Sequence, residues 1–233
     1  MTELAPHRTN YFKAVVIIQI ILIVEALLLE DIFKIFIPES ETSKSICEIL
    51  FIIPTITYMY YLFKLVRSFE RNVKYVNAVF FILFFTFIVG GTIASPGVHI
   101  VEGFHRRLLL FFVQIFLFLS FCKIIYFTLL EIFDDEVTVN ERLWGSTCLF
   151  LMIAITFTSL YDIVCLIYPN AIGIQHNLRM LDYMHNLSYS INVIGALDTA
   201  FPNAIPMIQH ISIIEAAWSH IFALILVGRL LSK

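Results

Sequence analysis

The sequence has few charged residues for its length: 14% of its 233 residues are Asp, Glu, Lys or Arg, whereas 60% are hydrophobic. The mean hydropathy is +0.88. This scarcity of charge excludes an ordinary soluble globular protein, because long apolar runs with few charges are typical of membrane spans. It also leaves no room for a soluble ligand-binding or enzymatic module, and we expect no nucleic-acid partner.

The motifs of intramembrane catalysis are missing as well. The sequence contains no H-E-x-x-H, no Gly-x-Ser-Gly nucleophile and no paired membrane aspartates. No inverted repeat that would favour a transporter is visible. Its four cysteines, Cys47, Cys122, Cys148 and Cys165, lie in or beside apolar runs without the close Cys/His spacing of a metal site. We therefore expect no enzyme, no cofactor and no metal site.

Six apolar runs dominate what is present, at about 14–37, 47–66, 76–96, 107–130, 147–168 and 207–231. Each is long enough to cross a bilayer as a helix. The segment 182–198 is too short to cross and too apolar for a free loop, so we predict that it is re-entrant and covered by protein. The predicted fold is an all-α integral membrane protein. A four-helix bundle occupies residues 1–133, and a helix, a re-entrant loop and a helix occupy residues 134–233.

The distribution of basic residues predicts the orientation. With the amino terminus placed inside, the inner segments hold nine of the 15 lysines and arginines and the outer segments hold five. Cytoplasmic segments of membrane proteins carry an excess of Lys and Arg. We therefore expect both termini in the cytoplasm. The fourth span carries only Arg106, Arg107 and Lys123, which is too few for a voltage sensor with a basic residue at every third position.

The last third of the chain, 141–233, is similar to a known family. Val137-Thr138 and Leu143-Trp144-Gly145 are followed much later by IEAAWSHIFALILVGRL over residues 214–230. These stretches resemble the V-T-x-x-x-I-Y-G-A and L-E-A-x-x-G-Q-x-Y-x-A-x-L-V-A-R-L patterns of the bacterial potassium-channel superfamily. The resemblance implies a homotetramer in the lipid bilayer of the plasma membrane, the inner membrane of a bacterium, with one central pore for monovalent cations.

The same resemblance implies a selectivity filter at the end of the re-entrant segment. Its residues are Asn192, Val193, Ile194, Gly195, Ala196, Leu197 and Asp198. The family's T-V-G-Y-G uses two glycines and a threonine hydroxyl to direct carbonyls at a dehydrated ion. Leu197 stands in place of the second glycine and Val193 in place of the threonine, so we predict a cation pore that is not potassium-selective. The alternative is a channel-derived membrane sensor or accessory subunit that does not conduct.

The last helix is expected to line and gate that pore. By the resemblance, Glu215 braces the re-entrant helix and Ser219 replaces a small hinge residue. Helical periodicity from there places further residues along the cavity. These are Ala223, Leu226 and Val227. His220 either faces the cavity, where it would make cation flux depend on pH, or turns toward a neighbouring helix.

Three charges lie inside predicted spans, where an unpaired charge is costly. Lys123 is the natural partner of Glu25, and the pair has either a gating role or a purely structural one. Asp162 either hydrogen-bonds Asn192 or the re-entrant backbone behind the filter, or extends to the outer interface.

Overall fold

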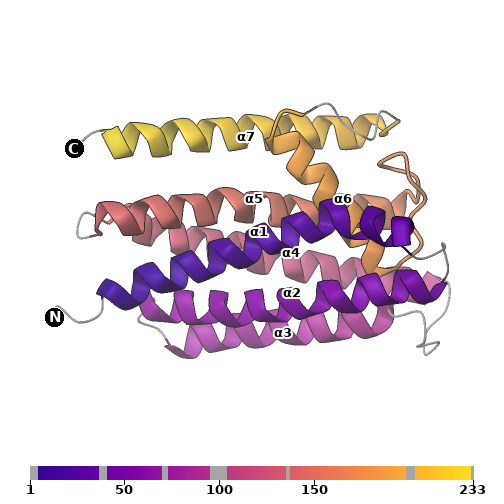
Figure 1. Cartoon of the computed structure of the whole chain (residues 1–233), viewed down its shortest axis with the longest axis horizontal. Coiled ribbons are helices and arrows are strands. Elements are labelled where there is room, and N and C mark those ends of the chain that lie inside the picture. Colours follow the sequence, from indigo (N-terminus) through magenta and orange to yellow (C-terminus); the bar gives the residue numbers. More distant parts are fainter. Residues whose placement is uncertain are drawn as a thin grey trace.

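The computed structural model describes residues 5–36, 41–69, 73–94, 104–134, 137–197 and 203–231. In these residues the chain forms helices and no strand (Figure 1). The helices are α1 (Ala5–Phe36), α2 (Glu41–Phe69), α3 (Val73–Ala94), α4 (Phe104–Ile132), α5 (Val139–Ile167), α6 (Met180–Ile194) and α7 (Pro206–Leu231). The all-α prediction is therefore confirmed for the described part of the chain.

Six of the helices, all except α6, are long and apolar enough to cross a membrane. The chain is accordingly a multi-pass membrane protein, and the six predicted spans are confirmed. Most of the helices extend beyond the apolar runs, because a helix satisfies its own backbone through the polar ends as well. With 15 residues, α6 is roughly 22 Å long at 1.5 Å per residue, which is too short to cross a hydrocarbon core of about 30 Å.

The long helices lie side by side along one direction, and α6 lies obliquely among them (Figure 1). Helix α1 begins and α7 ends at the same end of the helix bundle. We call the opposite end, where α1 ends and α7 begins, the α6 end. Helix α5 packs against α1, α4, α6 and α7, whereas α7 packs mainly against α5 and α6 among the described helices.

The corner between α4 and α5 is tight and well capped. Thr138 and Glu141 form a capping box, in which the Thr138 side chain accepts from the Glu141 backbone N–H and Glu141 accepts from the Thr138 N–H. Arg142 donates to the backbone carbonyl of Asp134 at 3.1 Å. Such caps satisfy backbone groups that the first turn of a helix leaves without partners. Helix α4 therefore turns directly back along α5.

Candidate functional site

The short helix α6 is held by polar contacts to each of the four helices around it. Every one of these helices contributes a carboxylate. The pairs are His185 with Glu30 of α1 at 2.6 Å, Arg179 with Glu48 of α2 at 3.0 Å, Asn186 with Asp162 of α5 at 2.8 Å, and Ser190 with Glu215 of α7 at 2.5 Å. Hydrogen bonds to ionised groups are stronger than those between neutral groups, so α6 is fixed in position and in rotation.

Three of the four carboxylates are deeply buried. Glu48 and Asp162 are 5% exposed and Glu215 is 0% exposed. A buried charge or polar group in a membrane is tolerated only when it has partners. The carboxylates and the polar side chains of α6 thus require one another. Without these carboxylates, the polar side chains of α6 would be buried without partners. Without α6, the carboxylates would be unpaired.

The amino terminus of α6 is built around Asp182 and His176. Asp182 accepts backbone N–H bonds from Arg179 at 2.8 Å and from Asn177 at 2.9 Å, and its charge suits the positive end of the helix dipole. The His176 Nε2 atom lies 2.8 Å from Asp162, and its Nδ1 atom lies 3.7 Å from Asp182. Among the described residues, no group of three such side chains is arranged to hold a metal ion, so this is a hydrogen-bonded network.

The charges in this network change the proton affinities of its members. Burial on its own lowers the pKa of His176, but the hydrogen bond and negative charge of Asp162, together with Asp182, outweigh burial and raise that pKa above its usual value. Burial raises the pKa of Asp182, although the nearby His176 opposes the shift. The imidazolium of His176 is therefore stabilised between two carboxylates.

Asp162 meets α6, but not at the predicted residue. Its Oδ1 atom accepts from Asn186 and pairs with His176, both at 2.8 Å. The predicted partner, Asn192, lies further along α6. The prediction that Asp162 bonds Asn192 is wrong, and so is its alternative of an interfacial carboxylate, since Asp162 is buried. Because α6 continues as a helix, the amide that faces α5 at this depth comes from Asn186.

Glu215 lies between α5, α6 and α7. The hydroxyl groups of Tyr161 and Ser190 donate to its two carboxylate oxygens, each at 2.5 Å. The Tyr161 ring packs edge-on against Tyr189 of α6, with centroids 4.9 Å apart. Glu215 therefore contacts the short helix in the way that the resemblance implies, and it joins the last helix to α5.

The predicted filter does not have a filter's backbone. Asn192, Val193 and Ile194 belong to α6, and the carbonyl groups of Asn192 and Val193 accept backbone N–H bonds from Leu197 at 3.0 Å and Ala196 at 3.1 Å. Carbonyls that are already paired cannot replace the water of an ion. The first three residues of the predicted filter are therefore helical, and an ion pathway at this position stays a prediction.

The chain changes direction directly after α6. Gly195 is the C-cap, and Ala196 adopts a φ of 50°. With one glycine instead of two, the segment continues its helix up to that glycine and then turns. Leu197, which follows, is 59% exposed. Asp198, the last predicted filter residue, lies outside the described residues.

The described α7 residues that were predicted to line the pore do not share one exposed face. Ser219 is 1% exposed and donates to the Glu215 carbonyl at 2.8 Å, so it faces the interior of the chain. Ala223 is half-buried. The side chains of Leu226 and Val227 lie outside those that the structure describes. Ser219 does not lie on a lining face, because it belongs to the same helical stripe as Glu215, which contacts α5 and α6.

His220, by contrast, is exposed. Its Nδ1 atom donates to the backbone carbonyl of Ala216 at 2.6 Å, which leaves Nε2 as the atom that can accept a proton. The imidazole lies near the middle of the 26-residue α7. The pH response expected of His220 stays a prediction.

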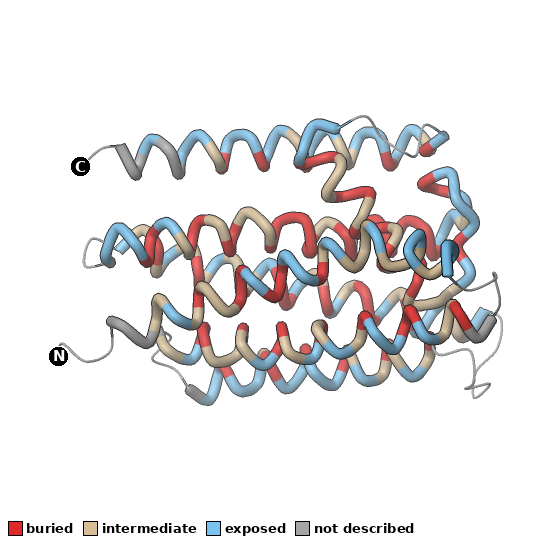
Figure 2. Tube along the Cα trace, viewed as in Figure 1, coloured by how far each residue is buried: buried red, intermediate tan, exposed pale blue. Residues whose placement is uncertain are grey.

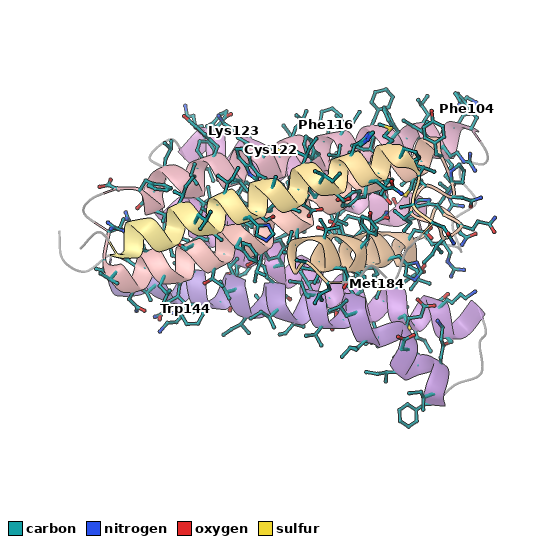
Figure 3. All side chains as sticks on the ribbon, turned by 90° about the horizontal axis from the view of Figure 1, so that it is seen from above. Phe104, Phe116, Cys122, Lys123, Trp144 and Met184 are labelled. Atoms are coloured by element: carbon teal, nitrogen blue, oxygen red, sulfur yellow. The ribbon has the colours of Figure 1, made fainter. Side chains whose placement is uncertain are left out.

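Glu25 and Lys123 do not form the predicted pair. The Lys123 ammonium lies over the rings of Tyr126 and Phe127, 4.8 and 5.0 Å from their centroids. Figure 3 shows Lys123 at one edge of the molecule, while Trp144, which contacts Lys13 of α1, lies at the other. Glu25 is roughly 16 Å from the α6 end along α1, whereas Lys123 is roughly 28 Å from it along α4. The two spans bring these charges to different depths and different sides of α5.

The sequence analysis missed most partners of α6. Glu30, Glu48, His176, His185 and Asn186 were not singled out. A signal was available, because Asp182, Asn186 and Ser190 recur at every fourth residue and so share one face of a helix. Asn186 and Ser190 on that face meet the acids of α5 and α7.

Comparison with protein-family models, curated proteins and solved structures found no match to this chain. The resemblance of the last third to potassium channels stays a prediction, and any assignment of function rests on the geometry above.

Proposed function

We propose that the chain is the subunit of a homotetrameric membrane channel, in which α7 lines a central pathway for monovalent cations and α6 supports it from behind. The observation that carries the proposal is the exposure of His220 near the middle of a helix able to cross the membrane. An imidazole facing lipid at that depth is costly. A neighbouring subunit or a water-filled cavity removes that cost.

The exposed surface of α7 has two different faces, which supports this arrangement. At 100° per residue, one face is apolar except for the exposed His210 at its border near the start of α7, and the other contains Gln209 and His220. The apolar face consists of Ile214, Trp218, Ile221 and Ile225, and the second face, which we call the His220 face, consists of Gln209, Ile213, His220 and Leu224. The first suits lipid or a neighbouring subunit, and the second suits an aqueous axis.

A closed ring follows from the same asymmetry. A chain with one exposed polar helix face cannot enclose a pathway alone, and cyclic symmetry is the usual way in which membrane and soluble proteins complete such a surface. Figure 2 shows how much of α7 is exposed beside the buried α5. Four copies follow the resemblance to potassium channels, with the termini on the cytoplasmic side of the plasma membrane.

The helical end of α6 bears on selectivity. Its paired carbonyls offer no row of oxygen ligands to a dehydrated potassium ion, so we propose a pore that discriminates poorly between potassium and sodium. The same observation favours one alternative: a channel-derived sensor or accessory subunit that does not conduct.

Substituted cysteines on α7 test the pathway. In a Cys122→Ser background, where the remaining cysteines are buried, His220→Cys and Trp218→Cys are treated with a membrane-impermeant thiol reagent in liposomes. Because only a thiolate in water reacts, we expect His220→Cys to react at least roughly tenfold faster. Equal rates would contradict an aqueous His220 face.

Native mass spectrometry and ion-flux measurements together distinguish a conducting channel from a non-conducting subunit. Native mass spectrometry should give four copies, and liposomes with opposed potassium, sodium and chloride gradients should leak both cations and no chloride. A tetramer with a reactive His220→Cys but no flux would support the non-conducting subunit. A stable monomer or an isologous dimer would contradict both.

A further inference from the structure

A cavity of about 70 Å³ lies among α2, α3, α4 and α6, close to the α6 end, and α1 and α5 contribute further wall residues. This is several times the ~10–15 Å³ that one water molecule needs. Most of its wall is aromatic or aliphatic, with Phe51, Phe87, Leu117 and Phe121 among the lining residues. An apolar cavity of this kind takes apolar guests more readily than water.

One side-chain oxygen in the described wall of the cavity lacks a hydrogen-bond partner. Gln114 is 7% exposed and lines the cavity, and its Oε1 atom has no hydrogen-bond partner among the described residues. A buried carbonyl without a donor costs about 1–3 kcal/mol. The position therefore favours a guest that brings a hydrogen-bond donor into an otherwise apolar space.

The charges around the cavity select against an ionised guest. At its α6 end lie Asp162, His176 and Arg179. Asp162 pairs with His176 at 2.8 Å, and Arg179 pairs with Glu48 at 3.0 Å. Asp182 lies 3.7 Å from His176. The cations are thus matched by carboxylates, so an anionic headgroup gains no unopposed positive charge.

The cavity has an open point in its wall at α3. A Cβ atom added to Gly91 would meet no atom within 4 Å, whereas at Gly90 it would lie 2.8 Å from Val113 Cγ1. Gly90 thus sets the close approach of α3 to α4, and Gly91 borders free space. Both glycines line the cavity.

We propose that this cavity binds an uncharged amphiphile from the bilayer, such as a medium-chain alcohol or another hydroxylated lipid, whose hydroxyl group donates to Gln114. The chain of the guest packs among the phenylalanines, and its hydroxyl satisfies the Gln114 carbonyl. The wall includes residues of α5 and α6 but none of α7, so the site does not depend on ion conduction.

Photoaffinity labelling of the full chain in lipid nanodiscs tests the site. The probes are a medium-chain alkanol that carries a diazirine and the matched diazirine alkane without a hydroxyl group. We expect the alkanol to label 87–94 and 110–121 in the wild type. Gln114→Leu should reduce this labelling about tenfold, the effect of one hydrogen bond, while labelling by the alkane stays unchanged.

A second variant distinguishes a blocked cavity from a misfolded protein. Gly91→Leu places a side chain into the open point and should abolish labelling by both probes, while the protein remains monodisperse. The control position is Phe116, which is 49% exposed and lies at the edge of the molecule (Figure 3). Labelling confined to Phe116 and similar exposed side chains, or equal labelling of all variants, would show partitioning into lipid and overturn the proposal. Absence of label inside the wild-type cavity would overturn it as well.

Discussion

Helices α5 and α7 flank the same short helix, yet they are built differently. In its most apolar stretch 67% of the residues of α5 are buried, against 22% for α7. Helix α5 contacts four other helices, whereas α7 offers one stripe to α5 and α6 and exposes most of its other described side chains. Helix α3 matches α5 in hydropathy yet is buried no more than α7, so hydropathy alone does not separate a central helix from a peripheral one.

The difference shows which positions of each helix are constrained by packing within the chain. On α5, almost every position is constrained by packing within the chain. On α7, the buried stripe of Ile208, Glu215, Ser219 and Phe222 fixes the helix to the rest of the chain, and the opposite surface is exposed. Polar residues matter for stability on the first kind of surface and for function on the second.

The largest effect is expected from breaking the contact of α7 with α5 and α6. Glu215→Ala removes the acceptor of the Tyr161 and Ser190 hydroxyl groups, and we expect a loss of about 2–4 kcal/mol in the free energy of unfolding. His220→Ala, on the exposed face of the same helix, should change it by less than about 0.5 kcal/mol. Unfolding in mixed detergent micelles measures both. Equal losses would show that the two faces are not distinct.

Two glycines provide a matched pair for packing. A Cβ atom at Gly145 of α5 would lie 2.7 Å from Ile132, whereas at Gly228 of α7 it would meet nothing within 4 Å. We expect Gly145→Ala to destabilise the protein by about 1–3 kcal/mol, and Gly228→Ala to be neutral or stabilising by up to about 1 kcal/mol. Thermal melting in detergent compares them. A destabilising Gly228→Ala seen only in the oligomer would indicate a contact between copies.

The contact of α5 with the loop before α6 should depend on pH. The folded state raises the pKa of His176, so its stabilising contribution is complete below the unfolded value of about 6.5. That contribution is lost as pH rises through the folded pKa. We expect the wild type to lose stability above about pH 6.5, and His176→Gln to lose less over the same range. Melting curves at a series of pH values decide this, and identical slopes would contradict a charged His176.

The smallest effect is expected between Glu25 and Lys123. Helix α5 packs against both α1 and α4 and separates the two charges, so Glu25→Gln and Lys123→Met should act additively within about 0.5 kcal/mol. A double-mutant cycle in detergent measures the coupling energy. A coupling well above that value would mean that the two side chains meet.

The sequence by itself determined the class of protein and the number of spans. Bilayer thickness fixes the length of a spanning helix, and the absence of water in the hydrocarbon core requires every backbone group to be paired. Six long apolar runs and one short segment therefore predict six spanning helices and one shorter element. No tertiary information is needed, because length and hydropathy are local properties of the chain.

Only the tertiary structure decided which polar groups meet. Asp162 pairs with His176 and Asn186, not with Asn192, and Glu30 reaches His185 across 155 positions of sequence. The rotation of each helix about its axis is set by packing against neighbours that are distant in sequence. That rotation places Ser219 inward and His220 outward, and it keeps α6 helical through the residues expected to form a filter.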